Sequence, residues 1–147
     1  MRATVASDMS TETEPSGRFS ALLTPATRTF LLVGFAAWFV ATVGLRLGGQ
    51  YVFDPGAPLV VGAVYAGTVP GMTALALVLF RWQGVRGAAR TQAAVALVLP
   101  GMLLDVVAVA WFGTVFPTMA PDAANYFAGQ ILLAYGFVLL AGLLGHR

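Results

Sequence analysis

The sequence predicts an all-α polytopic membrane protein whose four transmembrane helices form a bundle. Hydrophobic residues make up 59% of its 147 residues. Charged residues make up only 10%, against about 25% in a typical soluble domain. The apolar residues are gathered into four runs separated by short turn-rich or arginine-bearing segments. Each run is long enough to cross a hydrocarbon core of about 30 Å.

The chain begins with a segment of different composition. Residues 1–24 are rich in Ser, Thr, Glu and Pro and hold few large apolar side chains. Such a segment cannot bury enough apolar surface to fold alone, so we predict a disordered cytoplasmic tail. Thr24 and Pro25 then predict the start of the first helix, as an N-cap followed by proline at the first helical position. The transmembrane domain is therefore expected over residues 25–147.

The four predicted spans cover residues of about 29–47, 57–80, 92–112 and 126–144. A cleavable signal peptide is the alternative for the first. Its apolar run is longer than the roughly 7 to 15 residues of a signal peptide, so we expect the helix to be retained. Before the fourth span, Asp122 is expected to cap the last helix.

Arginine, the only basic residue type apart from one histidine, predicts the orientation. One set of segments, comprising the tail, the loop after the second span and the C-terminus, holds Arg2, Arg18, Arg28, Arg81, Arg86, Arg90 and Arg147. The opposite side holds only Arg46, with Asp54 and Asp122. Because cytoplasmic loops of membrane proteins carry the excess of basic residues, both termini are expected in the cytoplasm and the protein in the inner (plasma) membrane.

The composition also argues against several kinds of chemistry. Cysteine is absent and His146 is the only histidine, so the residues that hold zinc, copper, haem or iron-sulfur clusters are lacking. The sequence has no phosphate-binding loop, dinucleotide fingerprint or nucleophile elbow. Its scattered arginines form no nucleic-acid-binding face. We therefore expect no enzymatic activity, no catalytic residue, no cofactor and no metal, and no nucleic-acid partner.

Asp105 is the one carboxylate inside the third span. An aspartate at the centre of a membrane helix costs about 2.5 to 3.5 kcal/mol, so it should face inward and find a partner. Helical spacing supports this orientation, because Asp105 shares a face with small and apolar residues, Ala94, Val98, Gly101 and Ala108. Arg46 in the first span is the expected partner, since its long side chain can reach down from the interface.

Several other polar groups fall at a similar depth, in the outer half of the bundle. The candidate intramembrane polar cluster comprises Asp105, Arg46, Tyr65, Tyr135 and Gln50. Arg46 and Gln50 belong to a four-residue stripe on the first helix that also holds Trp38 and Thr42. The cluster is either a structural clamp that joins the first helix to the third, or a water-accessible site at which Asp105 binds a proton or a small ligand.

The second and third spans share the tripeptide Pro-Gly-Met, at Pro70-Gly71 and at Pro100-Gly101. Proline removes a backbone hydrogen bond and clashes with the carbonyl four residues earlier. We therefore predict kinks or local unwinding in both helices, at matching depths. Such kinks would splay the helix ends and open a cavity that includes Asp105.

The combination of "LPGMLLD", "TVFPTMAPDA" and a last span with "LLAYGFVLL" resembles an uncharacterised family of small four-span bacterial membrane proteins, known only as a domain of unknown function. The similarity is expected to run from the first helix to the fourth, and it implies four spans but no functional residue. The chain is also similar in size to small multidrug-resistance transporters. Those carry their membrane acid in the first helix, where this chain has none.

Two functions are therefore expected as alternatives. The first is a non-enzymatic accessory or structural membrane component, in which Asp105 and Arg46 pair. The second is a small proton-coupled transporter or channel that uses Asp105. The expected partners are the lipid bilayer and either a second copy of the chain or another membrane protein.

Overall fold

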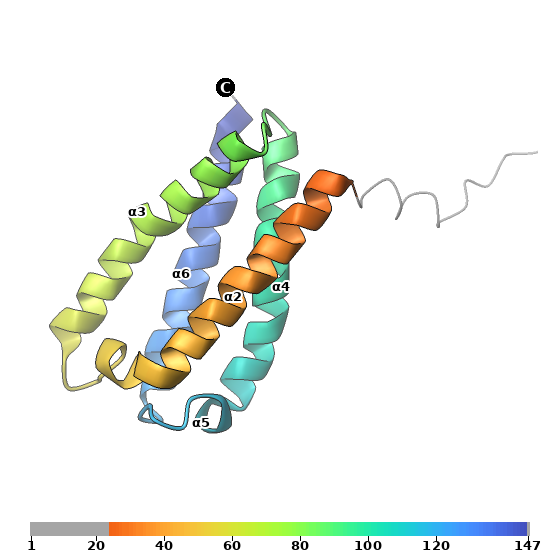
Figure 1. The fold of residues 1–147 in the computed structure, drawn as a ribbon. Helices are drawn as coiled ribbons and strands as arrows, with labels where there is room; N and C mark the ends of the chain where they lie inside the picture. The colour runs from red at the N-terminus through yellow and green to blue at the C-terminus, as the bar shows by residue number, and fades with distance from the viewer. Residues whose placement is uncertain (1–23, 147) are drawn as a thin grey trace, which may run out of the picture.

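The computed structural model describes residues 24–146, so the predicted tail lies outside it apart from Thr24. Four long helices run up and down through the molecule (Figure 1): α2 (Pro25–Val52), α3 (Pro58–Trp82), α4 (Ala89–Ala110) and α6 (Ala123–Leu143). A short helix α5 (Phe112–Val115) lies between α4 and α6, and the 3-10 turn η1 (Leu144–His146) follows α6. The described part of the chain contains no strand, which confirms the all-α prediction.

Each of the four long helices is apolar and long enough to cross a membrane. Even α6, with 21 residues, is about 32 Å long at 1.5 Å per residue. The predicted four-span bundle is confirmed, and the protein is a multi-pass membrane protein. The observed helices extend beyond several of the predicted apolar runs because flanking polar residues continue the helical hydrogen bonding.

The predicted start of α2 is confirmed. The Thr24 hydroxyl oxygen accepts a hydrogen bond from the Thr27 backbone N–H at 3.2 Å, and Pro25 occupies the first helical position. The prediction for Asp122 is only half right. Asp122 stands at the N-cap position of α6, but its side chain makes no capping hydrogen bond, because its backbone is already helical rather than extended.

Both internal prolines are accommodated within unbroken helices. α3 continues through Pro70 and α4 continues through Pro100, so the predicted local unwinding is wrong. A proline removes only its own N–H donor, and the hydrogen bonds on either side hold the helix together. The bending of the two helix axes stays a prediction.

The order of the helices around the bundle differs from their order along the chain. α2 packs against α4, α4 against α6, and α6 against α3. The consecutive helices α2 and α3 make few contacts, and α6 is visible between them in Figure 1. The second and third spans, whose prolines were expected to act together, are likewise not close neighbours.

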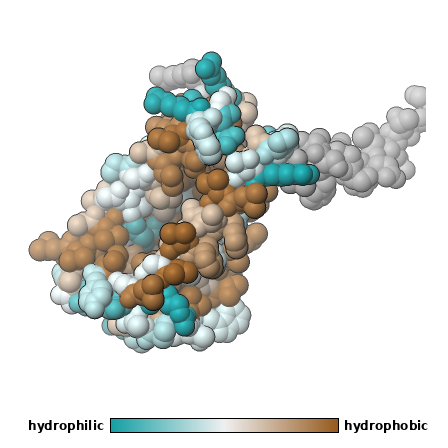
Figure 2. Space-filling model, viewed as in Figure 1, coloured by the Kyte–Doolittle hydropathy of each residue, from teal (hydrophilic) through white to brown (hydrophobic). Residues whose placement is uncertain are grey.

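The described ends of the chain lie at the same end of the bundle, together with the connection between α3 and α4 (Figure 1). We call this the arginine end, because it holds Arg28, Arg81, Arg86 and Arg90. The opposite end, formed by residues 53–57 and 111–122, is called the loop end. In Figure 2 hydrophobic residues cover most of the side of the bundle, and hydrophilic residues gather toward its ends, as expected for a molecule immersed in lipid.

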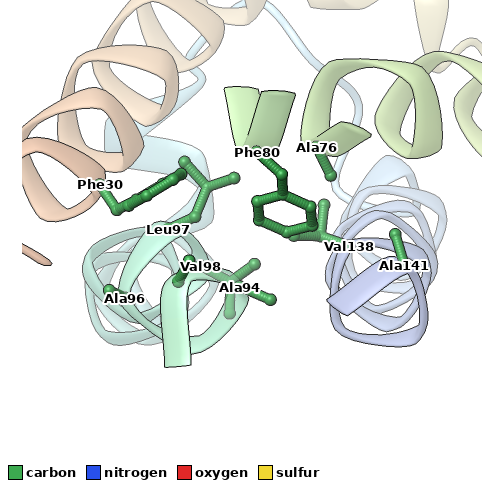
Figure 3. Close-up of a cluster of buried hydrophobic side chains, with 10 residues drawn as sticks. Phe30, Ala76, Phe80, Ala94, Ala96, Leu97, Val98, Val138 and Ala141 are labelled. Carbon is green, nitrogen blue, oxygen red and sulfur yellow. The ribbon is translucent and has the colours of Figure 1, made fainter. Parts of the chain in front are cut away.

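Two buried clusters hold the bundle together. The arginine-end core joins all four long helices, with Phe80 of α3 pointing between α4 and α6 (Figure 3). Its members are Phe30, Ala76, Phe80, Ala93, Ala94, Ala96, Leu97, Val98, Val138 and Ala141. The loop-end core is more aromatic, and comprises Phe53, Ala108, Phe112, Phe116, Met119, Ala123 and Phe127. The candidate site lies between these two cores.

Candidate functional site

A cavity of about 610 Å³ is lined by residues of all four long helices. This volume falls in the range of about 300 to 1,000 Å³ that is usual for small-molecule sites in proteins. Most of the wall is aliphatic or aromatic, and small residues of α2 such as Ala41, Gly44 and Gly48 form one side. The polar side chains of the wall are few: Trp38, Thr42, Thr68, Asp105, Gln130 and Tyr135.

Asp105 is the only charged residue in that wall and is buried, with 4% of its surface exposed. Its Oδ1 accepts a hydrogen bond from the Trp38 indole Nε1 at 2.8 Å. Its Oδ2 accepts a hydrogen bond from the Tyr135 hydroxyl. Since the three residues come from α2, α4 and α6, the carboxylate connects three of the four spans. The predicted inward orientation of Asp105 is confirmed, as is that of its stripe.

Gly101 explains how Tyr135 reaches the carboxylate. Gly101 lies one helical turn before Asp105, on the same face of α4. A Cβ atom at this position would stand 2.5 Å from the Tyr135 hydroxyl oxygen, which is too close for a real contact. The glycine therefore makes room for the tyrosine. The sequence placed Gly101 both in a predicted kink and in the inward-facing stripe of small residues, but it did not predict that Gly101 accommodates Tyr135.

Arg46 does not pair with Asp105, so the predicted clamp is wrong. Its Nη1 donates instead to the backbone carbonyls of Thr114, at 3.1 Å, and Val115, at 2.6 Å. These carbonyls end the short helix α5, where no further helical N–H is available to them. The Thr118 hydroxyl also donates to the Arg46 carbonyl at 3.3 Å. Arg46 thus fastens α2 to the loop end, near the interface, rather than reaching into the bundle.

Two other members of the predicted cluster lie elsewhere. The Tyr65 hydroxyl donates to the Tyr126 carbonyl at 2.5 Å and fits over Gly129, so it joins α3 to α6. Gln50 does not line the cavity, and its buried Oε1 has no hydrogen-bond partner among residues 24–146. Of the five predicted residues, the structure brings only Asp105 and Tyr135 together.

Two polar features of the cavity wall were not predicted from the sequence: the Trp38 indole and the pair of Thr68 and Gln130. Trp38 was predicted only as part of a stripe on the first helix, and its indole is the group of that stripe that bonds to Asp105 of α4. Thr68 and Gln130 form the second polar pair, in which the Gln130 Nε2 donates to the Thr68 hydroxyl oxygen. Gln130 is the only amide within the last predicted span. That observation alone would have made it a candidate.

The cavity wall offers a small number of hydrogen-bonding side chains in an apolar surrounding. Among residues 24–146, no group of three or more His, Cys, Asp or Glu side chains comes together. The wall offers one carboxylate, one amide and several neutral hydroxyl or indole groups in an apolar surrounding. A few convergent polar groups in an apolar pocket are the usual composition of a small-molecule site.

The fold and the cavity define a class: a multi-pass, all-α membrane protein with a polar site inside its helix bundle. The chain belongs to a family of unknown function, DUF5367, whose model matches residues 52–147. The match begins at the last residue of α2, so it is shorter than the expected resemblance over all four helices. No curated protein and no solved structure matches the chain.

Proposed function

We propose that this protein is a small membrane transporter that binds a cationic, largely apolar molecule in its cavity, with Asp105 as the anchoring residue. One observation carries the proposal: the Asp105 carboxylate lines the cavity and is held by two neutral donors, while Arg46 is engaged elsewhere.

The charge of the Asp105 carboxylate is not balanced by its protein partners. The Trp38 and Tyr135 donors satisfy lone pairs of Asp105 but supply no positive charge. An aspartate in a membrane span is costly unless its charge is compensated. A proton or a cationic ligand provides that compensation, and the apolar wall suits the body of a lipophilic cation. Because one carboxylate holds either a proton or a cation, the site can link the movement of one to that of the other.

The accessory or structural role expected from the sequence depended on an Arg46–Asp105 pair. The donors of Arg46 go to α5, so that role loses the ion pair and keeps only the neutral hydrogen bonds of Asp105 to Trp38 and Tyr135. We therefore rank ligand binding first. The proposed role is non-enzymatic, because binding and transport involve no chemical transformation of the ligand.

For location, we propose the inner (plasma) membrane with the arginine end in the cytoplasm. The excess of arginine at that end supports this orientation. Since the chain has no cysteine, a single introduced cysteine is the only residue that a maleimide labels efficiently. In intact cells, a membrane-impermeant maleimide should label Asp54→Cys at the loop end and spare Arg86→Cys at the arginine end. The reverse pattern would invert the proposed orientation.

Binding is tested with the purified full-length chain in detergent and with tetraphenylphosphonium as the lipophilic cation. We expect saturable binding to the wild type and a loss of at least tenfold in Asp105→Asn. Asp122→Asn is the matched control, because Asp122 is exposed and makes no capping bond. In vesicles, an outward gradient of the cation should drive proton uptake with the wild type alone. Folded Asp105→Asn protein that binds and transports normally would refute the proposal.

A further inference from the structure

Packed aromatic side chains lie between the cavity and each polar end of the bundle. Toward the arginine end, Val138 of the cavity wall belongs to the arginine-end core. In that core Phe30 of α2 and Phe80 of α3 are buried, and their ring centroids are 6.0 Å apart. Toward the loop end, Phe53 and Phe127 of the wall belong to the loop-end core. A ligand that came along the bundle axis would therefore have to displace one of the two cores.

The side of the cavity between α2 and α3 is open instead. These two helices make few contacts with each other, and Figure 1 shows α6 behind the space between them. The wall residues of α4 and α6 are all buried or half-buried. The exposed wall residues are Ala37, Ala41 and Gly44 of α2 and Leu75 of α3. We call the gap that these four residues border the lateral opening.

The lateral opening lies at the depth of the membrane hydrocarbon. At 1.5 Å per residue, Ala37 is about 18 Å from the start of α2 at Pro25, and Gly44 is about 12 Å from its end at Val52. The alanine, glycine and leucine residues at the rim carry no polar side-chain group. A molecule that stands at this opening is therefore surrounded by lipid tails and apolar side chains rather than by water.

Resting on the proposed function, we infer that the cation enters the cavity from the bilayer, through the lateral opening, and that the substrates are cations already dissolved in the membrane. A small hydrated ion would lose its water at an apolar opening, at a high cost in free energy. A cation whose charge is enclosed by aromatic or alkyl groups is soluble in lipid. Such a molecule reaches Asp105 by lateral diffusion, and neither buried core has to open.

The route is tested by the rates at which tetraphenylphosphonium binds the full-length protein in lipid nanodiscs. Gly44→Leu places a side chain at the rim, in a space that holds no heavy atom within 4 Å of the Cβ position. We expect association and dissociation both to slow about tenfold while Kd changes less than about threefold, because the path is narrowed and the Asp105 site is not. Leu75→Ala removes a rim side chain, so both rates should rise.

Gly62→Leu is the matched control. Gly62 is an exposed glycine of α3 with equally open space at its Cβ position, but it does not line the cavity. This variant should bind tetraphenylphosphonium at the wild-type rates. Thermal unfolding should show that none of the three variants loses its fold.

Two further probes distinguish the bilayer from water as the source. Methyltriphenylphosphonium and butyltriphenylphosphonium share a cationic head, but the butyl compound is more soluble in lipid. At equal concentrations in water, the butyl compound should associate faster, in proportion to its higher concentration in the bilayer. Equal association rates would indicate entry from water and would overturn the inference.

The remaining outcomes separate the inference from the proposed function. If Gly44→Leu binds at the wild-type rates while Asp105→Asn weakens binding, the inference is wrong and the proposed function stands. If light scattering shows that Gly44→Leu converts a dimer into a monomer, the opening is an interface between two copies, and the inference is likewise wrong. If Asp105→Asn binds tetraphenylphosphonium as the wild type does, the proposed function fails and the inference fails with it.

Discussion

Helix α2 meets its two neighbours in opposite ways. Against α4 it packs closely, because Gly34 lies directly against the backbone of Leu97 and leaves no space for a Cβ atom. At two other small residues of α2 that line the cavity the space is open: a Cβ atom at Gly44 or Gly48 would have no heavy atom within 4 Å. The close contact at Gly34 borders the cavity, and the open stretch at Gly44 and Gly48 forms part of its wall.

The comparison shows that small residues in a membrane helix have two structural outcomes. Where the facing helix also presents backbone, glycine allows close approach and good van der Waals packing. Where the facing helix stands away, the same residue type leaves an empty space. The contact between α2 and α4 also includes the hydrogen bond from Trp38 to Asp105. The width of the cavity and the position of Asp105 therefore both depend on the packing of α2 against α4.

The largest effect is expected at Gly34. The Cβ of Gly34→Ala would overlap the Leu97 carbonyl oxygen and push α2 away from α4. We expect a loss of about 2 to 3 kcal/mol in stability, typical of overpacking at a tight contact. Gly44→Ala, in the same helix, should be neutral or gain up to about 1 kcal/mol from its better helix propensity. Thermal unfolding in detergent checks both. Equal losses in the two variants would show that the contact between α2 and α4 is not tighter than the cavity wall.

The next largest loss of stability is expected when a polar contact across the bundle is removed. Tyr135→Phe keeps the ring but removes the hydroxyl that donates to Asp105, which leaves a buried carboxylate oxygen short of a donor. We expect a loss of about 1 to 2 kcal/mol. Tyr51→Phe is the control, since 76% of Tyr51 is exposed. An unchanged Tm in Tyr135→Phe would mean that another donor, such as water or a ligand, replaces the hydroxyl.

A smaller effect is expected for Arg46, which holds α2 from outside the bundle. Arg46→Leu should cost about 0.5 to 1 kcal/mol, because the side chain is exposed and water partly replaces its bonds. Hydrogen exchange should speed up near residues 114–119 and stay unchanged around Asp105. Faster exchange around Asp105, with the loop end unaffected, would support the Arg46–Asp105 pair that the sequence predicted.

The smallest effect is expected at the contact between α3 and α6. Tyr65→Phe removes the hydrogen bond to the Tyr126 carbonyl, for about 0.5 kcal/mol. Gly129, over which the hydroxyl lies, then gains free space. In Tyr65→Phe, a second change of Gly129→Ala should therefore be milder than in the wild type. A double-mutant cycle measures that coupling, and strictly additive effects would contradict it.

Features set by local sequence were predicted well. The four spans follow from the apolar runs, the start of α2 from Thr24 and Pro25, and the inward face of α4 from the spacing of its small residues. Contact between the first and third spans was also predicted, and α2 does pack against α4.

The residues that make this contact were predicted less well, for a physical reason. Charge complementarity favoured Arg46 as the partner of Asp105, but the end of α5 offers Arg46 free carbonyls nearer the interface. Trp38, two turns earlier on the same stripe, takes the place beside the carboxylate. Such a competition between distant partners depends on the rotation and depth of each helix, which periodicity along one helix does not define. The same holds for the pairing of Thr68 with Gln130.

The order of the helices also bears on how the protein is made. As the chain is synthesised, α2 and α3 enter the membrane first, yet their packing partners, α4 and α6, come from the second half. The first hairpin is therefore inserted before either of its helices has its main packing partner, and Trp38 has its hydrogen-bond acceptor only once Asp105 has been inserted. Assembly consequently proceeds in two stages, because α2 can pack once α4 has been inserted, whereas α3 must wait for α6, the last span.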